Sequence, residues 1–130
     1  MSNIKFPMSN QTQNQNDKKV YDLVERTSKF GIMSINFAKS LSENNINNPI
    51  INQFIRSATS IGANYMEADC AESKRDFNHK IGICKKESKE TTHWLIMIQA
   101  ANPEKEIECQ RLFKEAHELT LIFSSIFNKK

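Results

Sequence analysis

The chain has few residues that interrupt helices, since its 130 residues include only 3 Gly and 3 Pro. This scarcity favours long helices, because glycine and proline mark turns and breaks. The glycines stand alone at Gly31, Gly62 and Gly82, so there is no glycine-rich loop for phosphates. No apolar run approaches the roughly 18 residues that span a bilayer. The first residues also lack the apolar core of a secretory signal. We therefore expect no membrane partner and no secretion.

Cysteine is also scarce, and the spacing of the cysteines does not indicate disulfide pairs. The chain has 3 Cys, an odd number without a CxxC spacing, which favours a reduced, cytoplasmic setting over a disulfide framework. Cys84 and Cys109 fall on predicted core positions, where a cysteine behaves as a small hydrophobic residue. Cys70 is expected near an exposed helix end, with no predictable base beside it. We predict no nucleophilic catalysis from these thiols.

Charge is nearly absent from one segment. Arg56 is the only charged residue between Asn44 and Met66, whereas 25% of the whole chain is charged. A helix with so few charges can face water along only a narrow strip. It must be covered by its own fold, by a second copy of the chain, or by both. This favours an assembly protein over an enzyme.

The length is that of a single domain with a core of its own. Residues 1–16 are rich in Asn and Gln, without periodicity, and predict a disordered polar tail. Over residues 17–130, apolar residues recur at steps of three and four, which predicts helices at about 17–43, 49–70, 74–100 and 103–127. Short connections between them predict an all-α fold, a left-handed antiparallel four-helix bundle with up-down-up-down topology.

Helix starts carry recognisable signals. Asn48 is expected to cap the second helix, with Pro49 in its first turn. Ser73 followed by Asp76 resembles a capping box for the third helix. Asn102 precedes the fourth helix. The predicted core positions of the four helices are Val20, Val24, Thr27, Gly31, Ser34, Ala38 and Leu41; Ile51, Phe54, Ile55, Ala58, Ile61, Gly62 and Tyr65; Phe77, Ile81, Cys84, Ser88, Thr91, Leu95 and Ile98; and Cys109, Leu112, Ala116, Leu119, Phe123 and Ile126.

The third helix separates its charges around the helical wheel. One edge is basic and the other is mainly acidic, with the only Trp beside it. The plain interpretation is a solvated surface with pairs such as Asp76–Lys80 and Lys86–Glu90. The alternative is that the acidic edge meets protein and the basic edge meets an anion. The candidate phosphate contacts are then Lys74, Arg75, Lys85, Lys86 and Lys89.

A polar stripe on the second helix is a possible partner for the acidic edge. Its members are spaced so that they share one face, and they are Arg56, Ser60, Asn64 and Glu67. In antiparallel helices joined near residues 70–73, Arg56 falls at the level of Glu87. We predict that Arg56 pairs with Glu87 or Glu90, and Glu67 with Lys80 or Arg75, either between helices or between subunits. Trp94 completes this edge. Such a stripe fixes register more than it adds stability.

These residues also carry a family resemblance over about residues 20–127. The runs Arg56-Ser-Ala-Thr-Ser60-Ile-Gly-Ala-Asn64-Tyr-Met-Glu67, Ser73-Lys-Arg-Asp76-Phe77-Asn-His-Lys80 and Cys84-Lys85-Lys86-Glu87-Ser-Lys-Glu90-Thr-Thr-His-Trp94-Leu95 resemble the 23S rRNA-intervening sequence proteins. The resemblance implies a bacterial four-helix bundle assembled as a pentamer. It also implies a relation to the accessory variability protein of diversity-generating retroelements, which is thought to bind nucleic acid. No enzyme activity is implied.

Metal chemistry finds little support in the sequence. Glu90 and His93 have the Glu-x-x-His spacing of di-iron bundles, which need two such motifs and two further inward glutamates. Here there is one copy, and it points away from the core. His79 and His93 are 14 residues, or about 21 Å, apart on one helix, too far to share an ion. We expect no metal and no cofactor.

The sequence therefore favours a non-enzymatic homo-oligomer that acts as a scaffold or adaptor and binds RNA or DNA through backbone phosphates. The net charge of +3 permits such contacts without demanding them. A mixed-charge surface without this role, in a structural protein–protein interaction module, is the alternative. No small-molecule substrate is predicted. No aromatic platform is expected beside the basic edge, which argues against sequence-specific recognition of single strands.

Overall fold

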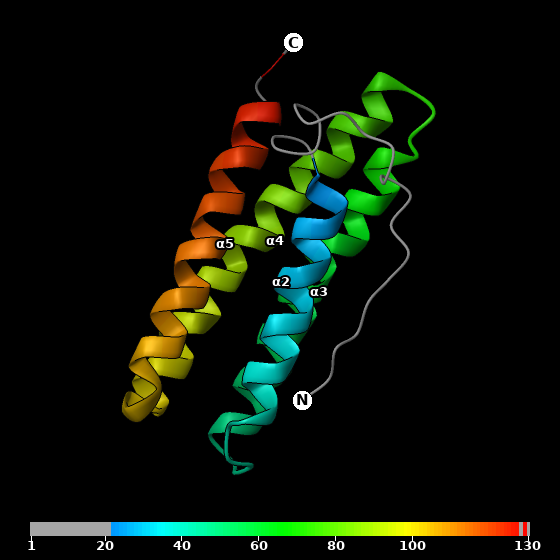
Figure 1. The fold of residues 1–130 in the computed structure, drawn as a ribbon. Helices are drawn as coiled ribbons and strands as arrows, with labels where there is room; N and C mark the ends of the chain where they lie inside the picture. Colours follow the sequence, from blue (N-terminus) through cyan, green and yellow to red (C-terminus); the bar gives the residue numbers. More distant parts are fainter. Residues whose placement is uncertain (1–21, 128, 130) are drawn as a thin grey trace.

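The computed structural model describes residues 22–127 and residue 129. Its elements are α2 (Leu23–Lys39), α3 (Asn47–Asp69), α4 (Lys74–Ala101), the 3-10 turn η1 (Pro103–Lys105) and α5 (Glu106–Phe127), as Figure 1 shows. This part of the chain contains no strand, and none of its helices is long and apolar enough to cross a membrane. The predicted all-α four-helix bundle is confirmed. The predicted tail, residues 1–16, lies outside the described residues.

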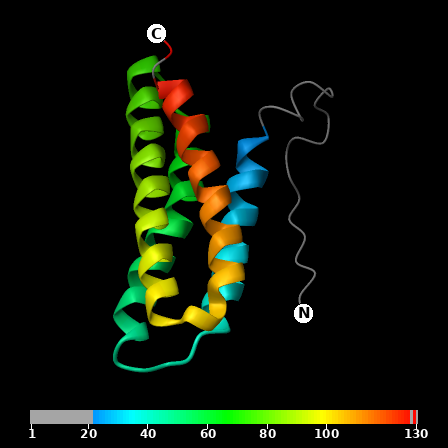
Figure 2. The same ribbon diagram turned by 90° about the vertical axis from the view of Figure 1, so that its left-hand side faces the viewer.

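Each helix in Figure 1 is followed by one that runs in the opposite direction. The helices pack chiefly as sequential neighbours, α2 on α3, α3 on α4 and α4 on α5, while α2 and α5 meet much less extensively. Figure 2 shows the α2–α3 and α4–α5 connections at the same end of the bundle. The left-handed supercoil stays a prediction.

Two of the helices begin as local sequence chemistry dictates. The Ser73 side chain accepts a hydrogen bond from the backbone N–H of Asp76 at 3.0 Å, which confirms the predicted cap of α4. At α2, the Asp22 carboxylate accepts from the N–H of Glu25 at 3.3 Å. This cap places the helix start at Leu23, whereas the sequence predicts a start near residue 17. Residues 17–21 lie outside the described residues.

The connection from α2 to α3 differs from the predicted one. Asn48 lies inside α3 and does not cap it, because the N-cap position is Ile46, which has no side-chain cap bond. Just before the helix, the Asn44 side-chain oxygen accepts from the N–H groups of Ile46 and Asn47. The helix therefore begins two residues before Pro49. At the other side, α2 ends at Lys39 instead of residue 43. The reason is that Ser40 and Leu41 close tight turns onto the preceding carbonyls, and Leu41 then folds into the core.

The core follows the predicted positions closely in α4 and α5 and less closely in α2. The side chains of Ile81, Cys84, Leu95, Ile98, Leu112, Ala116, Leu119 and Phe123 are all buried as predicted. Of the positions predicted for the first helix, Thr27, Gly31, Ser34 and Leu41 are buried as predicted, whereas Val24 and Ala38 are only partly buried. The large side chains of Leu23, Phe30 and Phe37 are buried as well, because large apolar side chains gain more from burial than the small residues of the predicted stripe.

Candidate nucleic-acid interface

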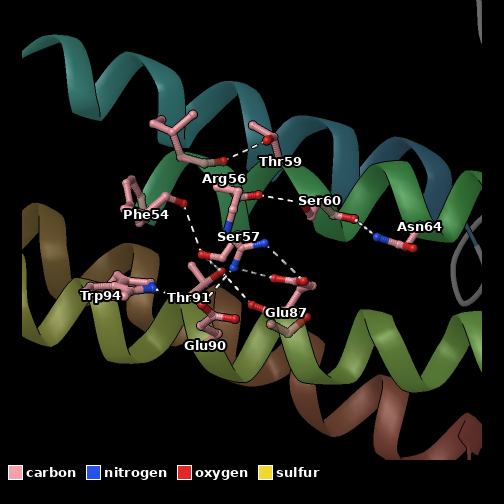
Figure 3. A network of polar contacts seen from close by, with 12 residues as sticks. Phe54, Arg56, Ser57, Thr59, Ser60, Asn64, Glu87, Glu90, Thr91 and Trp94 are labelled. Carbon is pink, nitrogen blue, oxygen red and sulfur yellow. Dashed lines mark hydrogen bonds and ion pairs between the residues drawn. The ribbon is translucent and has the colours of Figure 1, made fainter. Parts of the chain in front are cut away.

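The edge of α4 that faces α3 is neutralised by ion pairs. Arg56 donates to Glu87 at 3.2 and 3.4 Å and to Glu90 at 2.8 Å, as Figure 3 shows. Lys80 pairs with Glu67 at 2.6 Å. The pairs predicted from the sequence are therefore present, and they lie between helices of one chain. Arg75, the alternative partner of Glu67, forms no ion pair in the part that the structure describes.

Burial differs strongly across the Arg56 cluster. The Glu87 residue is only 7% exposed, whereas the Arg56 side chain is 46% exposed. Hydrogen bonds raise the pKa of Arg56, and the bonds to Glu87 contribute more than the bond to Glu90. Burial raises the pKa of Glu90, but hydrogen bonds from Arg56 and Trp94 together with nearby positive charge outweigh it, so the pKa of Glu90 lies below its ordinary value. The Glu90 carboxylate thus stays charged at neutral pH.

The other members of the predicted stripe have local roles. The Ser60 hydroxyl donates to the carbonyl of Arg56, and the Asn64 amide donates to the carbonyl of Ser60. Neither of these bonds reaches α4, so Ser60 and Asn64 do not join the two helices through them, and a role of this stripe between subunits stays a prediction. A polar bridge does cross the same interface deeper in the core. There the Thr91 hydroxyl lies 2.9 Å from that of Ser57 (Figure 3).

The opposite edge of α4 keeps its positive charge. None of the five predicted phosphate contacts forms an ion pair with another described residue, and they are Lys74, Arg75, Lys85, Lys86 and Lys89. The predicted surface pair Lys86–Glu90 is absent at ion-pair distance, since Glu90 is held by Arg56. Four of the five cations are exposed, and Lys85 is partly covered. The two edges of α4 therefore differ in electrostatic character as the sequence predicts.

An aromatic side chain lies beside this basic edge, contrary to prediction. The C-terminal end of α5 brings the ring of Phe127 under Lys85, with the ammonium 5.5 Å from the ring centre. A Cβ atom at Gly82 would lie only 3.1 Å from this ring, so glycine leaves space for it. The sequence of α4 alone could not reveal this neighbour, because Phe127 is 42 residues away from Lys85.

A hollow of about 600 Å³ extends the same face towards the start of α4. Three cations, one amide and two apolar side chains line it, namely Lys74, Arg75, Lys129, Asn78, Phe77 and Ile126. None of the described residues that line it is acidic. This combination of positive charge and apolar surface suits a ligand that carries both a phosphate and a flat apolar part.

A second groove, not predicted from the sequence, separates α2 from α5. Arg26 donates to Glu115 at 2.7 and 2.9 Å and also to Glu118. These bonds raise the pKa of Arg26, against a smaller opposing effect of burial. A hollow of about 470 Å³ lies around this cluster. The ion pairs with Arg26 thus occupy Glu115 and Glu118, two of the four glutamates of α5.

Two of the three cysteines are buried in the core, and the third is exposed. Burial raises the pKa of Cys84 to about 12 and that of Cys109 to about 11, so neither is a thiolate at neutral pH. Cys70 is exposed at the end of α3. His79 and His93 are exposed on α4. Within the described residues, no group of three Cys, His, Asp or Glu side chains is arranged to hold a metal ion.

Comparison with known proteins agrees with this architecture. The chain is similar to a protein of unknown function from the S23 ribosomal protein family of Bacteroides thetaiotaomicron, at 28% identity, with a TM-score of 0.72 over 82% of this chain and 99% of that one. No curated protein matches the sequence. The model of the family described as "23S rRNA-intervening sequence protein" matches residues 14–125. The chain therefore belongs to the 23S rRNA-intervening sequence protein family.

Proposed function

We propose that this protein is a non-enzymatic, homo-oligomeric scaffold that binds RNA or DNA through backbone phosphates. The observation that carries the proposal is the basic edge of α4. Its five cations have no ion-pair partner among the described residues, while Glu87 and Glu90 of the same helix are paired with Arg56 of α3. Cations left free along one edge are the electrostatic footprint expected of a phosphate-binding surface.

Assembly would compensate for the modest charge of one chain. Phosphate affinity grows with the number of neutralised contacts, so a patch repeated around identical subunits binds more strongly than one copy. The description of the family refers to 23S rRNA. That reference makes ribosomal RNA fragments a sensible first probe, alongside mixed sequences.

Self-association is supported by the outward face of α2 and α3. The exposed residues of α3 are mainly uncharged, including Asn52, Gln53, Ala63 and Met66. A neighbouring hollow of about 660 Å³ is lined by five apolar residues, Ile35, Ala38, Leu41, Ile51 and Ile55, together with Lys39, Glu43, Asn48 and Asn52. Monomeric proteins rarely leave such surfaces uncovered. The same observation favours the second candidate function, a structural protein–protein interaction module without nucleic acid.

Light scattering on the full chain distinguishes the two functions. We expect an oligomer whose mass rises when a pool of short RNA and DNA is added at low salt, and falls back at high salt. The test variant has Lys85, Lys86 and Lys89 changed to Ser. It should form the same oligomer as the wild-type chain but lose most of the mass increase on addition of nucleic acid. An oligomer that ignores nucleic acid at both salt concentrations would contradict phosphate binding and favour the interaction module.

A further inference from the structure

We infer that the hollow between the start of α4 and the end of α5 holds an unpaired base, so that the preferred ligand is single-stranded nucleic acid. The inference rests on the proposed function and deepens it. Its first ground is the composition of the hollow, in which Phe77 and Ile126 form apolar walls between Lys74, Arg75 and Lys129. Phosphate contact alone needs no such walls.

Duplex and single-stranded nucleic acids present different parts of their bases to a protein. In a duplex the bases are stacked on one another, so they present only their edges to a protein. An unpaired base exposes its flat face and can lie on an aromatic side chain. Phe77 and Asn78 are both half-buried in the wall of the hollow. The amide of Asn78 adds a donor and an acceptor that suit the polar edge of such a base.

The size and position of the hollow fit one nucleotide on a longer strand. Its volume of about 600 Å³ lies within the range of small-ligand pockets. From Lys74 the basic edge continues to Lys89, 15 residues and about 22 Å along α4. The ring of Phe127 lies on this line, beneath Lys85. A strand can therefore place one base in the hollow and its neighbouring phosphates on the lysines.

Fluorescence anisotropy with the full chain tests this inference. The probes are a labelled mixed-sequence single strand, as RNA and as DNA, and the duplex of the same sequence. Phe77→Leu keeps an apolar side chain but removes the ring, and we expect it to weaken single-strand binding by about tenfold. Phe113→Leu, at a half-buried phenylalanine of α5 outside the hollow, is the matched control and should leave binding unchanged.

Salt dependence separates the base contact from the phosphate contacts. Changing both Lys74 and Arg75 to Ala should reduce the slope of log affinity against log salt by about 1.4 for a single strand, while Phe77→Leu should leave the slope unchanged. Circular dichroism checks folding. If Phe77→Leu does not fold, Asn78→Ala takes its place, with a loss of about fivefold expected for the single strand only.

The outcomes distinguish this inference from the proposed function. Equal binding of duplex and single strand, with no effect of Phe77→Leu or Asn78→Ala, would overturn the inference and leave phosphate binding intact. Absence of binding to either form at low salt would overturn both. A loss confined to single strands, with the normal salt slope, would support the base-binding hollow.

Discussion

Arg56 is the single charged residue between Asn44 and Met66, and its guanidinium serves two carboxylates of α4. Glu87 depends more on Arg56 than Glu90 does, because Glu87 is buried and accepts two of these hydrogen bonds. Burying a carboxylate is costly unless it is paired. The half-exposed arginine thus lets α4 keep Glu87 inside the α3–α4 interface. The same pairing takes the acidic charge away from the basic edge.

Changing Arg56 to Met should expose this dependence. We expect the free energy of unfolding to fall by about 1–2 kcal/mol, because a buried carboxylate loses its charged donor while the exposed side of the pair contributes little. Glu87→Gln in the same chain should restore part of the loss. Urea unfolding of the two single variants and the double variant measures the coupling. Strictly additive effects would contradict a direct Arg56–Glu87 interaction.

The lowered pKa of Glu90 predicts how stability depends on pH. Burial opposes the shift, but Arg56 and Trp94 outweigh it. A carboxylate with a lowered pKa in the folded state adds stability above its unfolded pKa of about 4.3, and this stability is lost as pH falls through the folded pKa. Urea unfolding between about pH 6 and pH 3 should therefore show a decline that begins below about pH 4.3. Glu90→Gln should make the decline shallower, whereas a slope unchanged by this variant would contradict the assignment.

The helices meet at distances that their small residues permit. A Cβ atom at Gly62 of α3 would lie 3.3 Å from the Thr27 hydroxyl of α2, whereas one at Gly31 would find its nearest neighbour at 3.9 Å. Thr27 cannot move easily, because its hydroxyl is buried and donates to the carbonyl of Leu23 at 2.6 Å. Close packing of α2 on α3 thus depends on Gly62 more than on Gly31.

The two glycines make a matched pair for a stability experiment. Replacing a helical glycine with alanine gains about 1 kcal/mol of helix propensity where the methyl group fits. We expect Gly31→Ala to raise the free energy of unfolding by about 0.5–1 kcal/mol. Gly62→Ala should gain nothing or lose stability, since its methyl group presses on Thr27. Urea unfolding of both variants tests this, and a clear gain from Gly62→Ala would contradict the close approach.

The two connections at one end of the bundle are joined by a pair of side-chain amides. Asn47 and Asn102 are both buried and donate to each other at 3.1 and 3.0 Å. Each also donates to a backbone carbonyl, Asn47 to Ser42 and Asn102 to Ile98. This pair aligns the start of α3 with the end of α4. Reciprocal bonds satisfy both amides, so their burial costs little.

At the scale of the whole molecule, the described surface has a basic side and a side with few charges. The basic side follows α4 towards the end of α5, while the side with few charges follows α3, where Asn52, Gln53, Ala63 and Met66 are exposed. Such a division suits a subunit that associates through one side and presents the other to nucleic acid. Charge on the interface should then affect assembly, whereas charge elsewhere should not.

Ala63→Glu places a carboxylate at an exposed position of α3, on the side with few charges. We expect the solution mass to fall to that of one chain, 15.0 kDa, because burying an unpaired charge is unfavourable. Leu121→Glu adds the same charge at an exposed position of α5 and should leave the mass unchanged. Light scattering measures both variants. A monomeric wild-type chain, or an equal response of the two variants, would contradict self-association through α3.

The sequence by itself determined the features that depend on one helix or on two helices joined by a short turn. Periodicity placed Ile81, Leu95 and Leu119 in the core, and antiparallel register predicted that Arg56 faces Glu87. The tertiary structure alone decided contacts between elements whose spacing the sequence leaves open. These include the Arg26–Glu115 pair between α2 and α5, the Asn47–Asn102 amides, and Phe127 under Lys85. Their positions depend on the packing of the whole bundle, which local patterns of polarity do not specify.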